Sequence, residues 1–174
     1  MEIQDISRPI SAPVILGTSR QGRASEHAAA FVFDQVSKRN DMATELVGRF
    51  VRERRAYAAL ALTADGCVVT SVSNDYGYES VFERQIEALG KPGDVALGIT
   101  TSGSSANVVR ALETARSLTL TTIALTGRDG GAAGRTADLH INVPSDSTPR
   151  VQEVHMTLLH IICDLVEREL SAGD

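Results

Sequence analysis

The chain has 174 residues, a length that suits one folded domain of about 100–200 residues. Hydrophobic residues make up 43% of it and charged residues 22%, and the formal net charge of −5 argues against a nucleic-acid backbone as the main partner. No apolar run approaches the ~20 residues of a membrane span, and residues 1–13 do not look like a signal peptide, so we expect no membrane partner and a cytoplasmic location.

Short apolar runs alternate with longer amphipathic segments. In chain order the pattern predicts a strand at 14–16, a helix at 25–38, a strand at 58–62, a helix at 79–89, a strand at 95–99, a helix at 105–117, strands at 121–125 and 139–143, and a helix at 150–170. This alternation predicts an α/β protein, a three-layer αβα sandwich with a five-stranded parallel sheet. Ligands should then bind beyond the carboxyl ends of the strands.

Residues 24–47 contain neither Gly nor Pro. As a single helix they would carry Glu45 ~30 Å from the loop near Gly17 at 1.5 Å per residue. The charged residues 38–41 are expected to break this helix, with Asp41 capping a second one. The alternative is a strand over residues 43–48.

A loop rich in hydroxyl groups follows the predicted strand at 95–99. Five Ser or Thr residues and one Gly occupy positions 100–105, directly before a predicted helix. The first-turn N–H groups and the helix dipole suit an anion, and the hydroxyls add neutral donors. Such a loop alone is more often a simple cap and turn. At the carboxyl end of a parallel strand, however, it predicts a phosphate site formed by Thr100, Thr101, Ser102 and Ser105.

A second candidate anion loop follows the first predicted strand. A Gly/Ser/Arg-rich turn before a helix can bind phosphate, and it is also what an ordinary βα turn with a charged rim looks like. Its candidate ligands are Thr18, Ser19, Arg20 and Ser25.

In the last predicted helix, Gln152 and His160 are eight residues apart and share one face. A lone His on a mostly apolar helix is usually a core residue, but a Gln and a His on one stripe can project together into a site. Cys67 and Cys163 are expected to be reduced core thiols. The arginine cluster at 49–55 is expected to be solvated or to face an oligomer, with contact to an anionic ligand as the alternative.

Several segments resemble the sugar isomerase (SIS) fold: residues 93–95, 100–108 and 124–131. The segments 74–79, 143–145 and 152–155 narrow the resemblance to sedoheptulose-7-phosphate isomerase, also called phosphoheptose isomerase, over residues 45–169. The family makes D-glycero-D-manno-heptose 7-phosphate for lipopolysaccharide. The resemblance implies that Glu45 and His160 are the acid/base pair of an aldose–ketose isomerisation. It also implies that Gln152 and Asp75 lie near the sugar, although Asp75 reads equally well as a turn residue.

Some members of the family bind zinc through a His, the Glu, the Gln and the C-terminal His. Here the corresponding positions hold Asp41, Glu45, Gln152 and His160, so the resemblance implies either no required metal or zinc. The family is tetrameric and packs through an N-terminal helix that is missing here, so we expect a dimer or a tetramer.

The resemblance fails before residue 40. Residues 13–39 resemble instead an NADPH-dependent FMN reductase of the flavodoxin-like fold. The chain is thus interpreted as one SIS-like domain with three parts: a flexible N-terminus at 1–12, a flavodoxin-like βα unit at 13–42 and an isomerase-like part at 43–174. Such a chain would be a chimera of two families, and its isomerase activity could be impaired. The rival functions are a non-catalytic SIS binding module and FMN binding.

Overall fold

The structure, a computed structural model, describes residues 30–34 and 41–171. In chain order the elements are β1 (Ala30–Asp34), α1 (Asp41–Val47), β2 (Ala59–Ala61), α2 (Gly66–Tyr76), the 3₁₀ helix η1 (Tyr78–Ser80), α3 (Val81–Leu89), β3 (Val95–Thr100), α4 (Ala106–Ser117), β4 (Thr121–Gly127), α5 (Gly131–Thr136), β5 (Leu139–Val143) and α6 (Thr148–Ser171).

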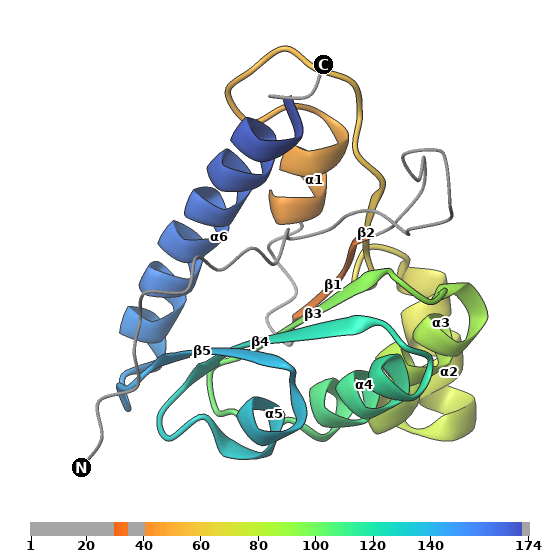
Figure 1. Ribbon diagram of the computed structural model, residues 1–174. Coiled ribbons are helices and arrows are strands. Elements are labelled where there is room, and N and C mark those ends of the chain that lie inside the picture. Colours follow the sequence, from red (N-terminus) through yellow and green to blue (C-terminus); the bar gives the residue numbers. More distant parts are fainter. Residues whose placement is uncertain (1–29, 35–40, 172–174) are drawn as a thin grey trace.

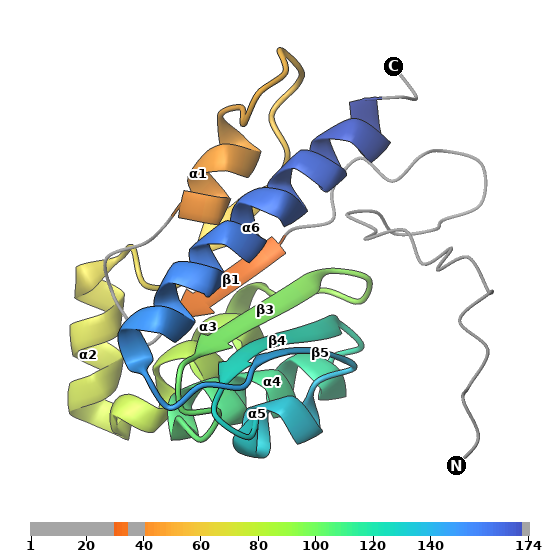
Figure 2. The ribbon, with the colours of Figure 1, turned by 90° about the vertical axis from the view of Figure 1, so that its left-hand side faces the viewer.

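The strands form one parallel sheet in the order β2-β1-β3-β4-β5. Helices cover both of its faces (Figure 1), as a parallel sheet requires, because each crossover returns over one face or the other. Helices α3, α4 and α5 lie on one side, and α1 and α6 lie together on the other, as Figure 2 also shows.

The core is divided by the sheet into two apolar clusters. Strand β3 is buried along its whole length, so its side chains alternate between the two faces. Ala96 belongs to the cluster under α3 and α4, whereas Leu97 and Ile99 belong to the cluster under α1 and α6. Because β4 repeats this pattern with Ala124 and Leu125, small residues face one helical layer and large residues face the other.

Helix α6 is fixed to the sheet near its start by His155, which is buried. The Nε2 atom of His155 lies 3.0 Å from the carbonyl oxygen of Thr126 in β4. A carbonyl only accepts, so Nε2 carries the hydrogen. Burial lowers the pKa of His155, although the hydrogen bond to Thr126 opposes this shift. The ring therefore stays neutral and serves as a structural donor.

The predicted helix at 25–38 is wrong where the structure describes it, because Ala30–Asp34 form strand β1. The run Phe31-Val32-Phe33 explains the difference, since aromatic and β-branched residues favour strands. The predicted strand at 14–16 lies outside the described residues and stays untested, whereas β1 is a strand of the sheet that was not predicted. Residues 41–47 form a helix and not a strand. The helix was one of the two alternatives considered for this segment.

The strands predicted at 58–62, 95–99, 121–125 and 139–143 are confirmed, as are the helices predicted at 79–89, 105–117 and 150–170. Helices α2 and α5 were not predicted. Helix α2 begins where Asp65 accepts hydrogen bonds from the backbone N–H groups of Cys67 and Val68, a typical N-cap. The expectation for Cys67 was wrong, because its place in this outer helix leaves it exposed, whereas Cys163 is buried. Within the described residues, no helix is both long and apolar enough to cross a membrane.

Candidate functional site

The hydroxyl-rich loop lies at the carboxyl end of β3, as predicted, and its side chains converge. The Oγ1 atom of Thr100 and the Oγ atom of Ser105 are 2.7 Å apart, and Ser102 Oγ lies within 3.4 Å of both. Thr100 and Ser105 are buried, whereas Thr101 and Ser102 are partly exposed. The two buried hydroxyls therefore support Ser102, and Thr101, Ser102 and the exposed Ser104 form the accessible surface of the loop.

Helix α4 starts directly after this loop, and no side chain caps it. Ser105 stands at the N-cap position, but its hydroxyl contacts Thr100 and does not bond a helix amide. The positive end of a 12-residue helix thus points out of the loop with no capping carboxylate. An anion at this position is stabilised by the helix dipole and by the neighbouring hydroxyls.

The loop is held by close backbone packing against the segment after β4. Gly103 has a φ of 69°, and a Cβ placed on it would clash with the backbone of Gly130. Gly131 is as close to Gly103 in return, and the N–H of Ala133 donates to the carbonyl of Gly103 at 2.8 Å. Only glycine on both sides permits this distance. The shape of the loop therefore depends on two strand-to-helix corners at once.

A chain of hydrogen bonds fixes the second of these corners. The Thr126 hydroxyl donates to Asn142 Oδ1 at 2.9 Å and so accepts from His140 Nε2, which lies 2.6 Å away. Asn142 Nδ2 donates in turn to the carbonyl of Arg128 at 3.1 Å. Sequence reasoning missed this network. The available signal was a Thr, a His and an Asn at the ends of two neighbouring parallel strands.

Gln152 lies in the first turns of α6 and is partly exposed. Its neighbour Val151 packs against Gly127, which also contacts the backbone oxygen of Thr101. His160 is exposed and lies two turns further along, ~12 Å from Gln152 at 1.5 Å per residue. The ring of His160 stacks on that of Phe50, with centroids 5.6 Å apart and an interplanar angle of 27°.

Glu45 is half-buried in α1, which packs against α6. Its charge reaches Cys163, one turn beyond His160 on α6: burial raises the pKa of Cys163 to about 11, and the negative charges of Glu45 and Glu167 add to the shift. Glu45 on α1 and His160 on α6 thus belong to two helices that pack together. The structure shows no hydrogen bond between their side chains.

The arginine cluster at 49–55 does not behave as one surface. Arg54 is neither solvated nor placed at a ligand: its side chain is 2% exposed and forms an ion pair with the buried Glu167, Nε to Oε1 3.1 Å. Arg49, Arg52 and Arg55 are exposed. The sequence signal that one arginine would be buried was Glu167. This residue follows Cys163 by four positions and thus lies on the buried stripe of α6, where a carboxylate needs a charged partner.

Asp75 is exposed in the last turn of α2, where it accepts a hydrogen bond from Asn74 at 2.9 Å, so its role at the sugar remains a prediction. The candidate anion ligands Thr18, Ser19, Arg20 and Ser25 lie outside the described residues. Among the residues that are described, no group of three or more His, Cys, Asp and Glu is placed to hold a metal ion.

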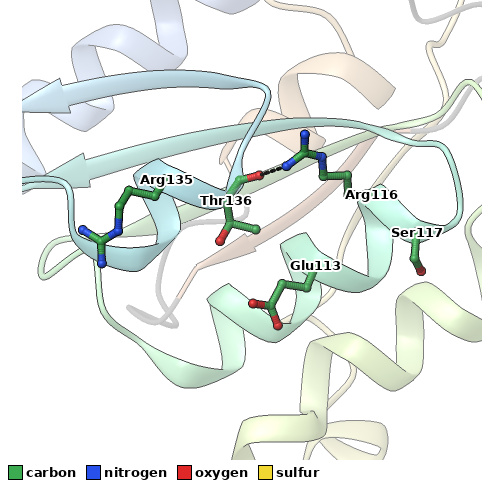
Figure 3. Close-up of a pocket in the computed structure, with 5 residues that line it drawn as sticks. All are labelled: Glu113, Arg116, Ser117, Arg135 and Thr136. Atoms are coloured by element: carbon green, nitrogen blue, oxygen red, sulfur yellow. Dashed lines mark hydrogen bonds between the residues drawn. The ribbon is translucent and has the colours of Figure 1, made fainter.

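Figure 3 shows a polar pocket at the opposite end of α4 from the loop. Arg116 points toward α5 and donates to the carbonyl of Thr136 at 3.3 Å, and it also pairs with Asp138 at 3.5 Å. Glu113 adds a negative charge to the same wall. The pocket is thus lined by a guanidinium that already has protein partners, and it is separate from the predicted site.

Known proteins resemble this chain in sequence and in fold. A model of the SIS domain family matches residues 37–127. The phosphoheptose isomerase of Geotalea daltonii is 47% identical over 167 residues, which cover 96% of this chain and 87% of the relative. That of Aquifex aeolicus is 56% identical over 126 residues, 72% of this chain and 66% of the relative. The structure of a phosphoheptose isomerase from Francisella tularensis has a TM-score of 0.77 and 36% identity, over 81% of this chain and 77% of that one.

The sheet is parallel, and a model of the SIS domain matches half of the chain. The protein is therefore an SIS-domain protein. Within that class, the chain belongs to the phosphoheptose isomerase family, since it is 47% identical to a member of which it covers 87%.

The interpretation of residues 13–42 as a flavodoxin-like unit finds no support. The alignment with the Geotalea protein spans 96% of this chain, and β1 lies inside the segment read as the helix of that unit.

We expect Gly103→Ala to lower the free energy of unfolding by about 1–3 kcal/mol, because alanine is strained at positive φ and its Cβ would clash with Gly130. The control is Gly66→Ala at the start of α2, where an added Cβ meets no atom within 4 Å and stability should stay level or rise slightly. Urea unfolding measures both. An unchanged midpoint for Gly103→Ala would contradict the close packing of the two corners.

Proposed function

We propose that the protein isomerises sedoheptulose 7-phosphate to D-glycero-D-manno-heptose 7-phosphate. The observation that carries this proposal is the hydroxyl-lined corner at the end of β3, in a chain of the phosphoheptose isomerase family. Thr101 and Ser102 would donate to the phosphate oxygens, with Thr100 and Ser105 holding Ser102 in place. The helix dipole of α4 adds to the attraction.

The chemistry needs two proton-transfer groups. Converting a ketose to an aldose moves a proton between C1 and C2 through an enediol, while a second proton moves between the two oxygens. The carboxylate of Glu45 would take the carbon-bound proton, and the imidazole of His160 would serve the oxygens, each contributing ~10²–10⁴-fold. Gln152, between the phosphate loop and His160 along α6, would bind a sugar hydroxyl, and Asp75 would bind another.

Fixing the phosphate at one end of the sugar holds the reacting carbons in register with the two proton-transfer groups. The loop lies at the carboxyl edge of the sheet, whereas Glu45 and His160 lie where α1 packs on α6. A seven-carbon sugar phosphate is long enough to need contacts at both places.

We expect Glu45→Gln and His160→Ala each to lower kcat for sedoheptulose 7-phosphate by about 10²- to 10⁴-fold, because each removes one proton-transfer group. Ser117→Ala, exposed at the far end of α4, is the control and should keep wild-type kinetics. Turnover is measured by the appearance of the aldose. A wild-type rate no higher than that of the variants would leave only a non-catalytic sugar-phosphate-binding module.

A zinc ion would take Glu45, Gln152 and His160 as ligands, with Asp41 one turn before Glu45 on α1, although the described residues do not form a ready-made metal cluster. The metal would polarise the sugar oxygens, while the proton transfers remain those of Glu45 and His160. We expect His160→Ala to bind zinc at least about 10-fold more weakly than wild type, since one of few ligands is lost. Calorimetric titration of metal-free protein tests this, and equal zinc affinities for the two proteins would remove zinc from the site.

FMN binding stays a prediction. A purified protein that is colourless and takes up no added FMN would contradict it.

We propose that the protein is a homo-oligomer, a dimer or a tetramer. Helix α6 carries Val154, Ile161 and Leu165 on one stripe, and these are 42%, 49% and 57% exposed. Apolar side chains gathered in this way are typical of subunit contacts. Ile161→Glu should lower the mass measured by analytical ultracentrifugation, whereas Arg150→Glu on the exposed start of the helix should not. Equal masses for wild type and Ile161→Glu would place any contact elsewhere.

A further inference from the structure

The buried carboxylate of Glu167 holds a loop that lies far from it in sequence. Its two oxygens accept hydrogen bonds from the backbone N–H groups of Phe50 (2.9 Å), Val51 (2.9 Å) and Arg52 (2.8 Å). They also accept from Nε of Arg54 at 3.1 Å. Glu167 is 1% exposed, so these protein groups replace water as its donors.

Arg54, the partner of Glu167, holds the end of helix α1. Its guanidinium donates to the carbonyl oxygens of Glu45 (2.7 Å), Leu46 (2.9 Å) and Gly48 (3.0 Å). The carbonyls of Glu45 and Leu46 are among those that a helix leaves without internal partners at its C-terminus, and Gly48 is the residue that follows α1. The guanidinium also lies 4.1 Å from the ring centroid of Tyr57, which fixes its plane. One side chain thus binds the main chain of Glu45 and the carboxylate on α6 together.

The same pair reaches His160 through Phe50. The backbone of Phe50 is bonded to Glu167, and its ring stacks on the imidazole of His160. Glu167 and His160 are seven residues apart on α6, two turns of one helix. The buried ion pair is therefore connected to both residues proposed to transfer protons: Arg54 bonds directly to the Glu45 carbonyl, and Glu167 is linked to His160 through Phe50.

We propose that Arg54 and Glu167 are positioning residues: together they fix the backbone of Glu45 and the ring plane of His160 relative to each other. This inference rests on the proposed function for the identity of the reacting groups, but the positioning itself is a structural property that can be measured without substrate.

The charge state of Glu167 is consistent with this role. Burial alone would raise the pKa of Glu167, but hydrogen bonds from Arg52, Val51 and Phe50 and the charge of Arg54 lower it below its usual range. The carboxylate stays ionised and keeps its hydrogen bonds. A purely structural ion pair would need no such convergence on Glu45 and Phe50, and it would affect stability alone.

Glu167→Gln and Arg54→Lys test the kinetic part. A displacement of about 1 Å can lower a rate up to ~10²-fold, so we expect kcat to fall about 10- to 100-fold in each variant. KM should change less than about twofold, because the hydroxyl-rich loop is a separate part of the fold. The matched controls are Glu169→Gln and Arg55→Lys, which change the neighbouring exposed residues and should keep wild-type kcat. Assays run well below each variant's melting temperature.

Nuclear magnetic resonance of the histidine rings tests the positioning directly. Stacking on Phe50 shifts the His160 ring signals, which are identified by their absence from His160→Gln. We expect these signals to move in Glu167→Gln and Arg54→Lys, while the signals of the buried His155 stay in place and show that the fold is intact. Should a buried-pair variant fail to fold, Phe50→Leu removes the ring without touching the ion pair. It should move the same signals and lower kcat.

The outcomes are distinguishable from those of the proposed function. A wild type without turnover, but with His160 signals that move as described, ends the isomerase proposal and leaves the positioning intact. Folded Glu167→Gln and Arg54→Lys variants with unchanged His160 signals would overturn the positioning, whatever the activity. So would a kcat that matches wild type in an active protein, or unchanged signals in Phe50→Leu.

Discussion

The ion pair between Arg54 and Glu167 is the contact on which the α1–α6 side of the molecule depends. Helix α1 has only seven residues, far fewer than an isolated helix needs in water. Its C-terminal carbonyls are satisfied by Arg54, and the loop that follows is satisfied by Glu167. The buried carboxylate of Glu167 has a fixed position, because any displacement would leave a charged or polar group without a hydrogen-bond partner. Local order in this region thus comes from tertiary contacts, namely this ion pair and the apolar cluster under α1 and α6.

Helix α6 connects this region to the carboxyl edge of the sheet. Near its start, His155 bonds to β4 and Val151 packs on Gly127; near its end, Glu167 holds the loop after α1. With 24 residues it is ~36 Å long, and it is fixed at both ends. A rigid element of this kind keeps the residues proposed to bind phosphate and those proposed to transfer protons at a constant separation. Precision in the site then follows from two anchors on one helix.

Much of this arrangement was predictable from local patterns. The apolar runs at β3, β4 and β5 and the Ser/Thr loop before α4 are local signals, and the structure confirms the elements they predict. The failures were tertiary. Residues 25–38 have no helix breaker, yet Phe31-Val32-Phe33 form a central strand once a sheet is present to pair with. Arg54 looked like one of several surface arginines, because its partner lies 113 residues later. Likewise, the contact between Gly103 and Gly131 joins two loops that no periodicity connects.

The proposed phosphate site is lined by neutral hydrogen-bond donors in a protein with a net negative charge. Around the loop at 100–105 the donors are hydroxyls and helix amides, and the nearby Arg110 is occupied by Ser80 and Glu79. Neutral donors bind a dianion less strongly than an arginine pair would, because charge-assisted bonds are about twice as strong. Binding then depends on shape, which is why the two glycine corners must approach so closely. Under the proposed function, a site of this kind would hold the phosphate for register and release it readily, which would leave binding energy for the transition state between Glu45 and His160.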